Sequence, residues 1–136
     1  DLLDWAKKSF RQMGMYLRFM EPKEHDKHMA YVSHLSHISS FMLGKTVLER
    51  EDDEQNIFDL AGSGFESTVR LAKSSPEMWL SIFEDNKAPI LDILTAYIDN
   101  LENFRKQLEE GAYTDLYNQL KNTNQLKTIL NGIKPN

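Results

Sequence analysis

The sequence feature that most restricts the fold is a segment without proline, residues 23–49, along which apolar residues recur at helical spacing. These residues form two stripes, one of Tyr31, Leu35, Ile38 and Met42 and another of Met29, Val32, Leu43 and Val47. A helix that is apolar on several sides is usually enclosed by the rest of the protein. The sequence therefore predicts a long, central and buried helix.

Helices are also predicted on both sides of this segment. Residues 4–12 have a helical pattern that ends at Gly14, and Ser75-Pro76 combines a capping serine with proline at the first helical position. After Asn86 the apolar residues alternate spacings of four and three, which is typical of a heptad seam: Ile90, Leu94, Tyr97, Leu101, Phe104 and Leu108. With short helices over 57–60 and 65–72 and a last helix over 114–130, the predicted fold class is all-α.

One short segment departs from the helical pattern. Met15 to Met20 is apolar and aromatic, lies between Gly14 and Pro22, and is too short for a helix, so we predict a β-strand. A single strand needs a partner for its N–H and C=O groups. Its sheet is therefore expected elsewhere.

Length and composition narrow the function classes. A chain of 136 residues fits one domain, and a net charge of -5 argues against nucleic acid as the main partner. The absence of cysteine excludes disulfides and thiolate chemistry and fits a reducing cytoplasm. The apolar runs are too short for a membrane helix, so we expect a soluble protein. Because the chain opens with Asp1 rather than methionine, we expect it to be part of a longer protein.

The predicted central helix carries all four histidines, His25, His28, His34 and His37. At roughly 100° per residue, several polar residues share a narrow face with one alanine: Asp26, Ala30, Ser33, His37 and Ser40. Because burying unpaired polar groups is costly, this face is expected to line a polar cavity or a partner. The alternative is that Ser33 and Ser40 bond back to the preceding turn and that His37 is a satisfied core histidine.

Other chemistry on this helix has less support. His34 and His37 are three residues apart, but no third ligand follows at matching spacing, so no metal site is predicted. Ser33 and His37 point in parallel on a helix, without the sharp turn that exposes a nucleophilic serine.

Arg70 is a second candidate for binding an anion. It follows the turn Gly62-Ser63-Gly64, and the free N–H groups at a helix start together with a guanidinium can bind a carboxylate or a phosphate. The alternative is a surface arginine paired with Glu66 at i, i+4.

Three segments together resemble one enzyme family. His25-Asp26 followed by Ser33-His34-Leu35-Ser36-His37 resembles the His-Asp…Ser-His-Leu-Pro-His signature of prephenate and arogenate dehydrogenases. Residues 64–74 and Pro76-Glu77-Met78-Trp79 are similar to that family's Gly-Phe-(Arg/Lys)-Asp-x-Thr-Arg-Ile-Ala and Pro-x-Met-Trp segments, in the same order.

This resemblance implies a helical dimerisation domain like the C-terminal domains of 6-phosphogluconate dehydrogenase-type two-domain dehydrogenases. Residues 23–136 would be the substrate-binding and dimerisation domain, and residues 1–22, with the predicted strand, a remnant of the nucleotide-binding (Rossmann) domain. The implied reaction is oxidative decarboxylation of prephenate, or of arogenate, with NAD or NADP, in tyrosine biosynthesis. The principal catalytic histidine and the cofactor site would lie in the Rossmann domain, so the chain alone is expected to be inactive.

By the same resemblance, Ser33, His34 and His37 line the substrate pocket, Arg70 receives a substrate carboxylate and Trp79 lies nearby. These groups are expected to converge on one hollow, and the chain to form a homodimer. Ser36 departs from the family's proline, and Glu66 and Ser67 from its basic residue and aspartate. Glu66 and Ser67 are therefore further candidate substrate contacts, through which the amine of arogenate could be bound. The rival hypothesis is a non-enzymatic helical interaction module that binds through the heptad seam.

Overall fold

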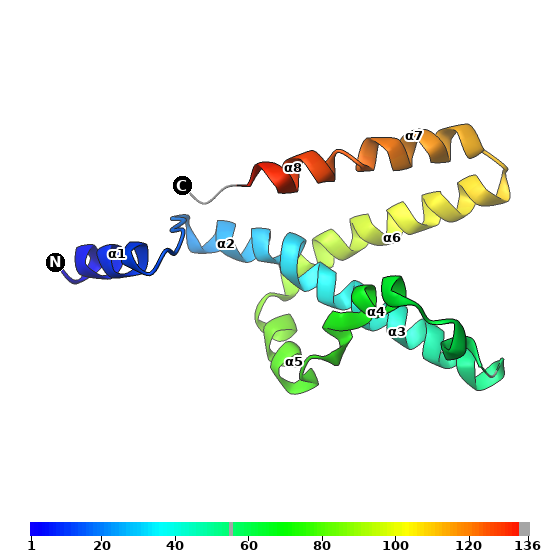
Figure 1. Ribbon diagram of the computed structural model, residues 1–136, viewed down its shortest axis with the longest axis horizontal. Coiled ribbons are helices and arrows are strands. Elements are labelled where there is room, and N and C mark those ends of the chain that lie inside the picture. Colours follow the sequence, from blue (N-terminus) through cyan, green and yellow to red (C-terminus); the bar gives the residue numbers. More distant parts are fainter. Residues whose placement is uncertain (55, 134–136) are drawn as a thin grey trace. The chain divides into compact units, whose positions relative to one another are not determined.

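The computed structural model describes residues 1–54 and 56–133, and within these residues every regular element is helical (Figure 1). This confirms the predicted all-α class. In chain order the elements are α1 (Leu2–Gln12), α2 (Pro22–Met29), η1 (Ala30–His34), α3 (Leu35–Asp53), η2 (Ile57–Leu60), α4 (Ser63–Val69), η3 (Arg70–Lys73), α5 (Pro76–Asp85), α6 (Lys87–Glu109), α7 (Tyr113–Thr123) and α8 (Leu126–Gly132). Of the three η elements, η1 is a π-helix, and η2 and η3 are 3-10 helices.

The chain divides into two compact units. One is residues 21–98, and the other combines residues 1–20 with residues 99–136. The first unit carries every candidate site residue that the sequence indicated.

The predicted central helix is interrupted by a π-helical turn. The N–H of Leu35 donates to the carbonyl of Ala30, five residues back, instead of four. Such a turn holds one extra residue and shifts the register of everything after it. The single polar face predicted at 100° per residue is therefore wrong across this turn: Ala30, His34 and Ser40 are the buried positions, while Ser33 and His37 are half-buried.

Ser40 joins α3 to the α4–η3 segment. Its hydroxyl donates to the carbonyl of Thr68 at 2.9 Å and accepts from the N–H of Ala72 at 3.1 Å. Only 2% of Ser40 is exposed. The alternative that Ser40 bonds back to its own helix is therefore wrong, since one hydroxyl satisfies two backbone groups of another segment.

We expect Ser40→Ala to lower the free energy of unfolding by about 1–3 kcal/mol, because it leaves a buried donor and a buried acceptor without their partner. Ser36→Ala is the matched control, since the hydroxyl of Ser36 is exposed and bonds only to Val32 of its own helix. That control should change stability by less than about 0.5 kcal/mol. Urea unfolding followed by circular dichroism measures both, and equal effects would contradict the bridging role.

Local signals account for the start of α5. The hydroxyl of Ser75 accepts from the N–H of Met78 at 3.3 Å, and Pro76 occupies the first turn, as predicted. Asn86 then ends α5 and precedes α6. These two caps fix the corner from which Trp79 and Asn86 extend.

The predicted strand is wrong. Gly14, at φ 75°, ends the α1 segment, but no β-strand is assigned to Met15–Met20 or elsewhere in the described parts of the chain. The physical reason is that a strand is defined by pairing to a neighbour. Residues 15–20 have the composition of a strand, but without a partner strand they form no ladder of hydrogen bonds.

In the second unit the chain reverses at Gly111, whose φ of 66° suits a glycine, and α7 returns antiparallel to the last turns of α6 (Figure 1). The single helix predicted over 114–130 is instead two, α7 and α8. They separate after Asn122-Thr123-Asn124, three residues with low helix propensity.

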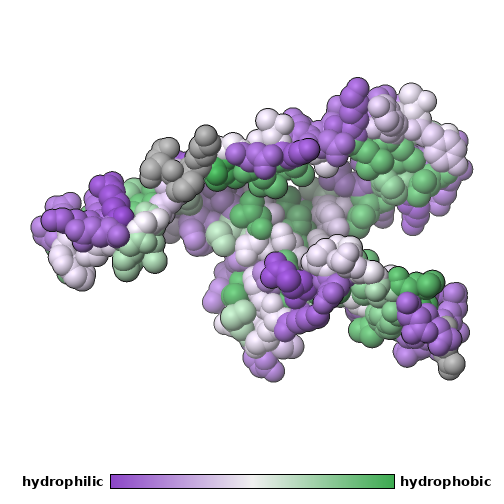
Figure 2. Space-filling model, viewed as in Figure 1, coloured by the Kyte–Doolittle hydropathy of each residue, from purple (hydrophilic) through white to green (hydrophobic). Residues whose placement is uncertain are grey.

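Much of the apolar surface remains uncovered. The heptad seam is buried or half-buried at its first three positions, but Leu101 is 52% exposed and Leu108 48%. Figure 2 shows hydrophobic side chains at the surface near the turn between α6 and α7. Among the described hydrophobic residues, the only buried ones are Ala30, Trp79, Ile90 and Leu116.

Candidate functional site

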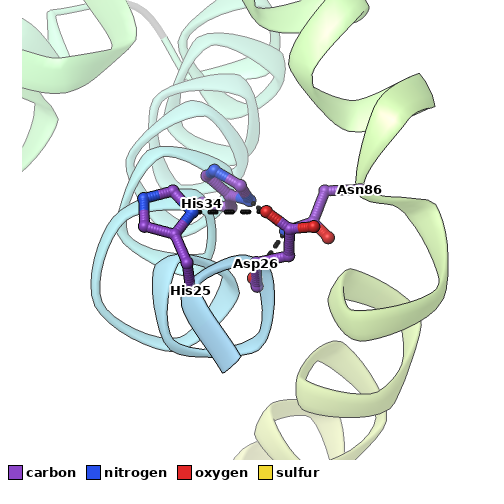
Figure 3. Close-up of polar contacts among 4 residues, drawn as sticks. All are labelled: His25, Asp26, His34 and Asn86. Atoms are coloured by element: carbon purple, nitrogen blue, oxygen red, sulfur yellow. Dashed lines mark hydrogen bonds and ion pairs between the residues drawn. The ribbon is translucent and has the colours of Figure 1, made fainter. Parts of the chain in front are cut away.

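His34 ends the π-helical turn and is 8% exposed, close against Asn86 at the start of α6. The side-chain amide of Asn86 donates to the carbonyl of Asp26 at 2.7 Å, and its nitrogen lies 3.1 Å from Nδ1 of His34 (Figure 3). An amide NH2 group donates and does not accept. Nδ1 of His34 must therefore be the acceptor, and the proton of the neutral ring is on Nε2.

The surroundings of His34 favour its neutral form. Burial lowers its pKa below the ordinary value, and the nearby His37 lowers it further, while Asp26 acts in the opposite direction and His25 adds a smaller lowering. Protonation would also turn Nδ1 into a donor facing the donor of Asn86. The ring is therefore a neutral hydrogen-bonding group at neutral pH rather than a cation.

This lowered pKa predicts a pH-dependent stability. The unfolded chain protonates His34 near its ordinary value of about 6.5, whereas the folded chain does so only at lower pH. Between those two values the unfolded state binds more protons, so stability is lost as the pH falls from 6.5 towards the folded pKa and is retained above 6.5. Urea unfolding at a series of pH values should show this loss, and His34→Asn, which keeps an acceptor near Nδ1, should reduce it. An unchanged slope in that variant would contradict the assignment.

His37 and Trp79 form a stacked pair beside His34. The ring centroids of His37 and Trp79 are 3.6 Å apart with the planes at 28°, and His34 meets the same indole edge-on at 5.9 Å. Nδ1 of His37 lies 3.0 Å from the carbonyl of Ser33. Since a carbonyl only accepts, Nδ1 of His37 donates, and the two histidines hold their fixed protons on opposite nitrogens.

Trp79 is the centre of this cluster. It is 6% exposed, and its ring also contacts Phe83, with centroids 5.5 Å apart. Its indole N–H is buried and has no hydrogen-bond partner among the described residues. The polar neighbours of Trp79 thus contribute ring contacts and not a hydrogen bond to the indole.

An apolar groove of about 770 Å³ lies between α3, α5 and the first half of α6. Trp79, Phe83 and Ile90 contribute to its lining. Ser33, His34, His37 and Arg70 do not line this groove. The expectation that the histidines and Arg70 share one hollow therefore stays a prediction.

The other predicted residues lie on α4 and η3. Arg70 is exposed and begins η3, two helical turns after the start of α4 and not in its first turn. Within the described residues it forms no ion pair, and the Nζ of Lys73, not Arg70, lies 3.8 Å from Glu66. Ser67 is exposed, and its hydroxyl donates to the carbonyl of Gly64 at 3.0 Å. The Arg70–Glu66 ion pair, which was the alternative for Arg70, is therefore not present among the described residues.

Sequence reasoning missed the contact of Asn86 with His34. It placed Asn86 only as the residue before the helix with the heptad seam. A polar residue between two apolar helices is the signal that could have raised the question, because such a residue, once buried, needs partners.

Comparison with known proteins bears directly on these residues. The family model described as "Prephenate dehydrogenase, dimerization domain" matches residues 21–122, well over half of the chain. The chain belongs to the prephenate dehydrogenase family.

Two relatives of known function are prephenate dehydrogenases. The chain is 30% identical over 106 residues to a prephenate dehydrogenase of Bacillus subtilis, a match covering 75% of this chain and 28% of that protein. It is 32% identical over 105 residues to the prephenate dehydrogenase of Lactococcus lactis, covering 73% of this chain and 27% of that one. The chain thus spans about a quarter of these prephenate dehydrogenases.

A solved prephenate dehydrogenase has the same fold. The crystal structure from A. aeolicus, in complex with hydroxyphenyl propionate and NAD+, superposes with a TM-score of 0.84 at 28% identity. The match covers 94% of this chain and 45% of that one. This confirms the expected helical domain of the prephenate dehydrogenase family.

The described residues of this chain do not fit a dinucleotide cofactor on their own. A dinucleotide site places a glycine-rich turn between a strand and a helix. Here the turn Gly62-Ser63-Gly64 follows the 3-10 helix η2 and opens only the short α4.

In the described part of the chain, no helix combines the length and apolar character needed to cross a membrane.

Proposed function

We propose that this chain is the substrate-binding and dimerisation part of a cytoplasmic dehydrogenase that oxidatively decarboxylates prephenate to 4-hydroxyphenylpyruvate with NAD or NADP. The cofactor would be held by a nucleotide-binding domain outside this chain. The observation that carries the proposal is the cluster of His34, His37 and Trp79, which falls inside the matched residues 21–122.

The chemistry of this cluster suits an oxygen-rich anion. Prephenate carries two carboxylates, and a neutral His34 with its proton on Nε2 offers a donor to a carboxylate oxygen. His37, with its proton fixed on Nδ1, has an acceptor at Nε2 when neutral, which suits a hydroxyl. Arg70 would add a bidentate, charge-assisted bond to a carboxylate. These groups bind and orient the substrate, and Ser33 beside them is a further polar contact.

Arogenate is the alternative substrate. One relative is a cyclohexadienyl dehydrogenase of Zymomonas mobilis, 26% identical over 107 residues that cover 76% of this chain and 36% of that protein. Binding the arogenate amine would require a free carboxylate, and Glu66 is the candidate, with Ser67 beside it. Because Lys73 already lies 3.8 Å from Glu66, prephenate is the substrate we favour.

A direct test compares this chain with the same chain joined to the nucleotide-binding domain that precedes it in the whole protein. With prephenate and either NAD or NADP, we expect turnover only for the joined protein, measured as reduced cofactor by absorbance at 340 nm. Turnover by the chain alone would contradict the proposal that the cofactor is held by a domain outside this chain. No turnover by the joined protein with prephenate or arogenate would leave the helical interaction module as the better hypothesis.

We also propose that the active form is a homodimer. Support comes from the description of the matched family model as a dimerization domain and from the apolar residues left uncovered on α7 and α8, such as Leu120 at 56% and Leu130 at 63% exposure. Monomeric proteins rarely expose large apolar patches. Light scattering should give twice the chain mass, and a monomer at high concentration would contradict the proposal.

A further inference from the structure

Asn86 is the polar residue that connects three segments of the first unit. It is 9% exposed and bridges the carbonyl of Asp26, 60 residues away, and the ring of His34, 52 residues away. Figure 3 shows the side chain of Asn86 reaching from the beginning of α6 towards both partners. By bonding to two such distant partners, this buried amide fixes how the corner between α5 and α6 lies against α2 and the π-helical turn.

The orientation of this amide follows from its partners. The carbonyl of Asp26 can only accept, so the NH2 end of Asn86, and not its oxygen, must face it at 2.7 Å. The second hydrogen of the same NH2 group is then left for Nδ1 of His34 at 3.1 Å. The Asp26 carbonyl thereby determines, through Asn86, which nitrogen of His34 carries the proton.

We propose that Asn86 is a positioning residue that holds His34 in the Nε2–H form, so that the free edge of the imidazole donates a hydrogen bond to an anionic oxygen of the substrate. The inference rests on the proposed function, in which His34 contacts the substrate. It adds to that function a residue, Asn86, that influences substrate specificity only by orienting His34.

The alternative forms of His34 would each oppose an anionic substrate or the fold. With the proton on Nδ1, the free edge would present a lone pair to a carboxylate, and the proton would face the NH2 of Asn86. The doubly protonated ring would also lose the Asn86 bond and carry a charge beside His37, with Asp26 and His25 as the other titratable neighbours. Trp79 meets the ring edge-on and carries no charge.

The test observes directly which ring nitrogen of His34 carries the proton. In the whole protein labelled with ¹⁵N-histidine, the ring nitrogens of His34, assigned by comparison with a His34→Gln variant, should show Nε2 protonated and Nδ1 bare. Asn86→Asp offers an acceptor in place of the donor, so the proton should move to Nδ1 or the ring should become doubly protonated. Asp26→Asn is the matched control, because the carbonyl that Asn86 uses belongs to the backbone and the Nε2–H form should persist.

Kinetics of the same proteins separate this inference from the proposed function. We expect Asn86→Asp and Asn86→Leu to raise the KM for prephenate about tenfold with little change in kcat, the effect of losing one hydrogen bond to the substrate. An unchanged KM in His34→Ala would overturn the proposed substrate contact, and the role of Asn86 with it. A raised KM in His34→Ala but not in either Asn86 variant would overturn the inference alone. If both Asn86 variants fail to fold, a wild-type ring protonated on Nδ1 would still overturn it.

Discussion

Replacing Arg70 with alanine in the complete enzyme is expected to raise the KM for prephenate about 100-fold and to change kcat by less than about threefold. A bidentate bond from a guanidinium to a carboxylate contributes roughly 3 kcal/mol when both partners are charged. The carboxylate that it holds is present in the ground state and the transition state alike. Its loss should therefore weaken binding without slowing the chemical step.

Lys73→Ala is the matched control for this experiment. Lys73 lies on the same 3-10 turn as Arg70, carries the same charge, and is placed beside Glu66. Steady-state kinetics should give it a KM within about twofold of the wild type. Arg70→Lys should fall between, since an ammonium keeps the charge but not the fork geometry. A fall in kcat at constant KM, or equal effects of Arg70→Ala and Lys73→Ala, would contradict the proposed role.

The helices were largely predictable because their signals are local. Ser75-Pro76 and Gly14 act through their own backbone geometry, so the sequence reveals them without knowledge of the partners. The position of α6 also followed from its heptad spacing. The strand prediction failed for the complementary reason, because pairing depends on a second segment that a residue pattern does not contain.

The π-helical turn explains the error at the site itself. A residue pattern analysed at one fixed angle cannot register an i→i+5 bond such as the one between Leu35 and Ala30. This turn buries His34 and leaves Ser33 and His37 half-buried. The contact of His34 with Asn86 was equally beyond prediction, since 52 residues separate the pair. Family motifs predicted which residues contact the substrate, whereas the packing and proton positions of those residues required the structure.

These proton positions connect packing to chemistry. His34 and His37 contact the same indole, yet one receives a hydrogen bond at Nδ1 and the other donates one there. The cluster therefore offers a donor edge at His34 and, when His37 is neutral, an acceptor edge at His37. Such an arrangement can discriminate between a carboxylate and a hydroxyl, provided that the indole keeps both rings in place.

Trp79→Ala should therefore have the largest effect on stability, lowering the free energy of unfolding by about 3–5 kcal/mol. The side chain is 6% exposed, and its removal leaves a cavity between His34, His37 and Phe83. A loss of that size is a large share of the 5–15 kcal/mol that typically stabilises a domain. Urea unfolding at a fixed protein concentration, followed by far-ultraviolet circular dichroism, measures it.

Two further variants separate packing from the indole N–H. Trp79→Phe keeps an aromatic ring beside the histidines and removes a buried N–H that has no partner among the described residues. The lost contact area and the removed unsatisfied donor should nearly offset each other, so we expect a change of at most about 1 kcal/mol. Trp5→Ala is the control, because Trp5 is 66% exposed and its loss should cost less than about 0.5 kcal/mol. If Trp79→Phe were as destabilising as Trp79→Ala, the N–H would have to be hydrogen-bonded in the protein, and Trp79 would hold the cluster through that bond and not through stacking.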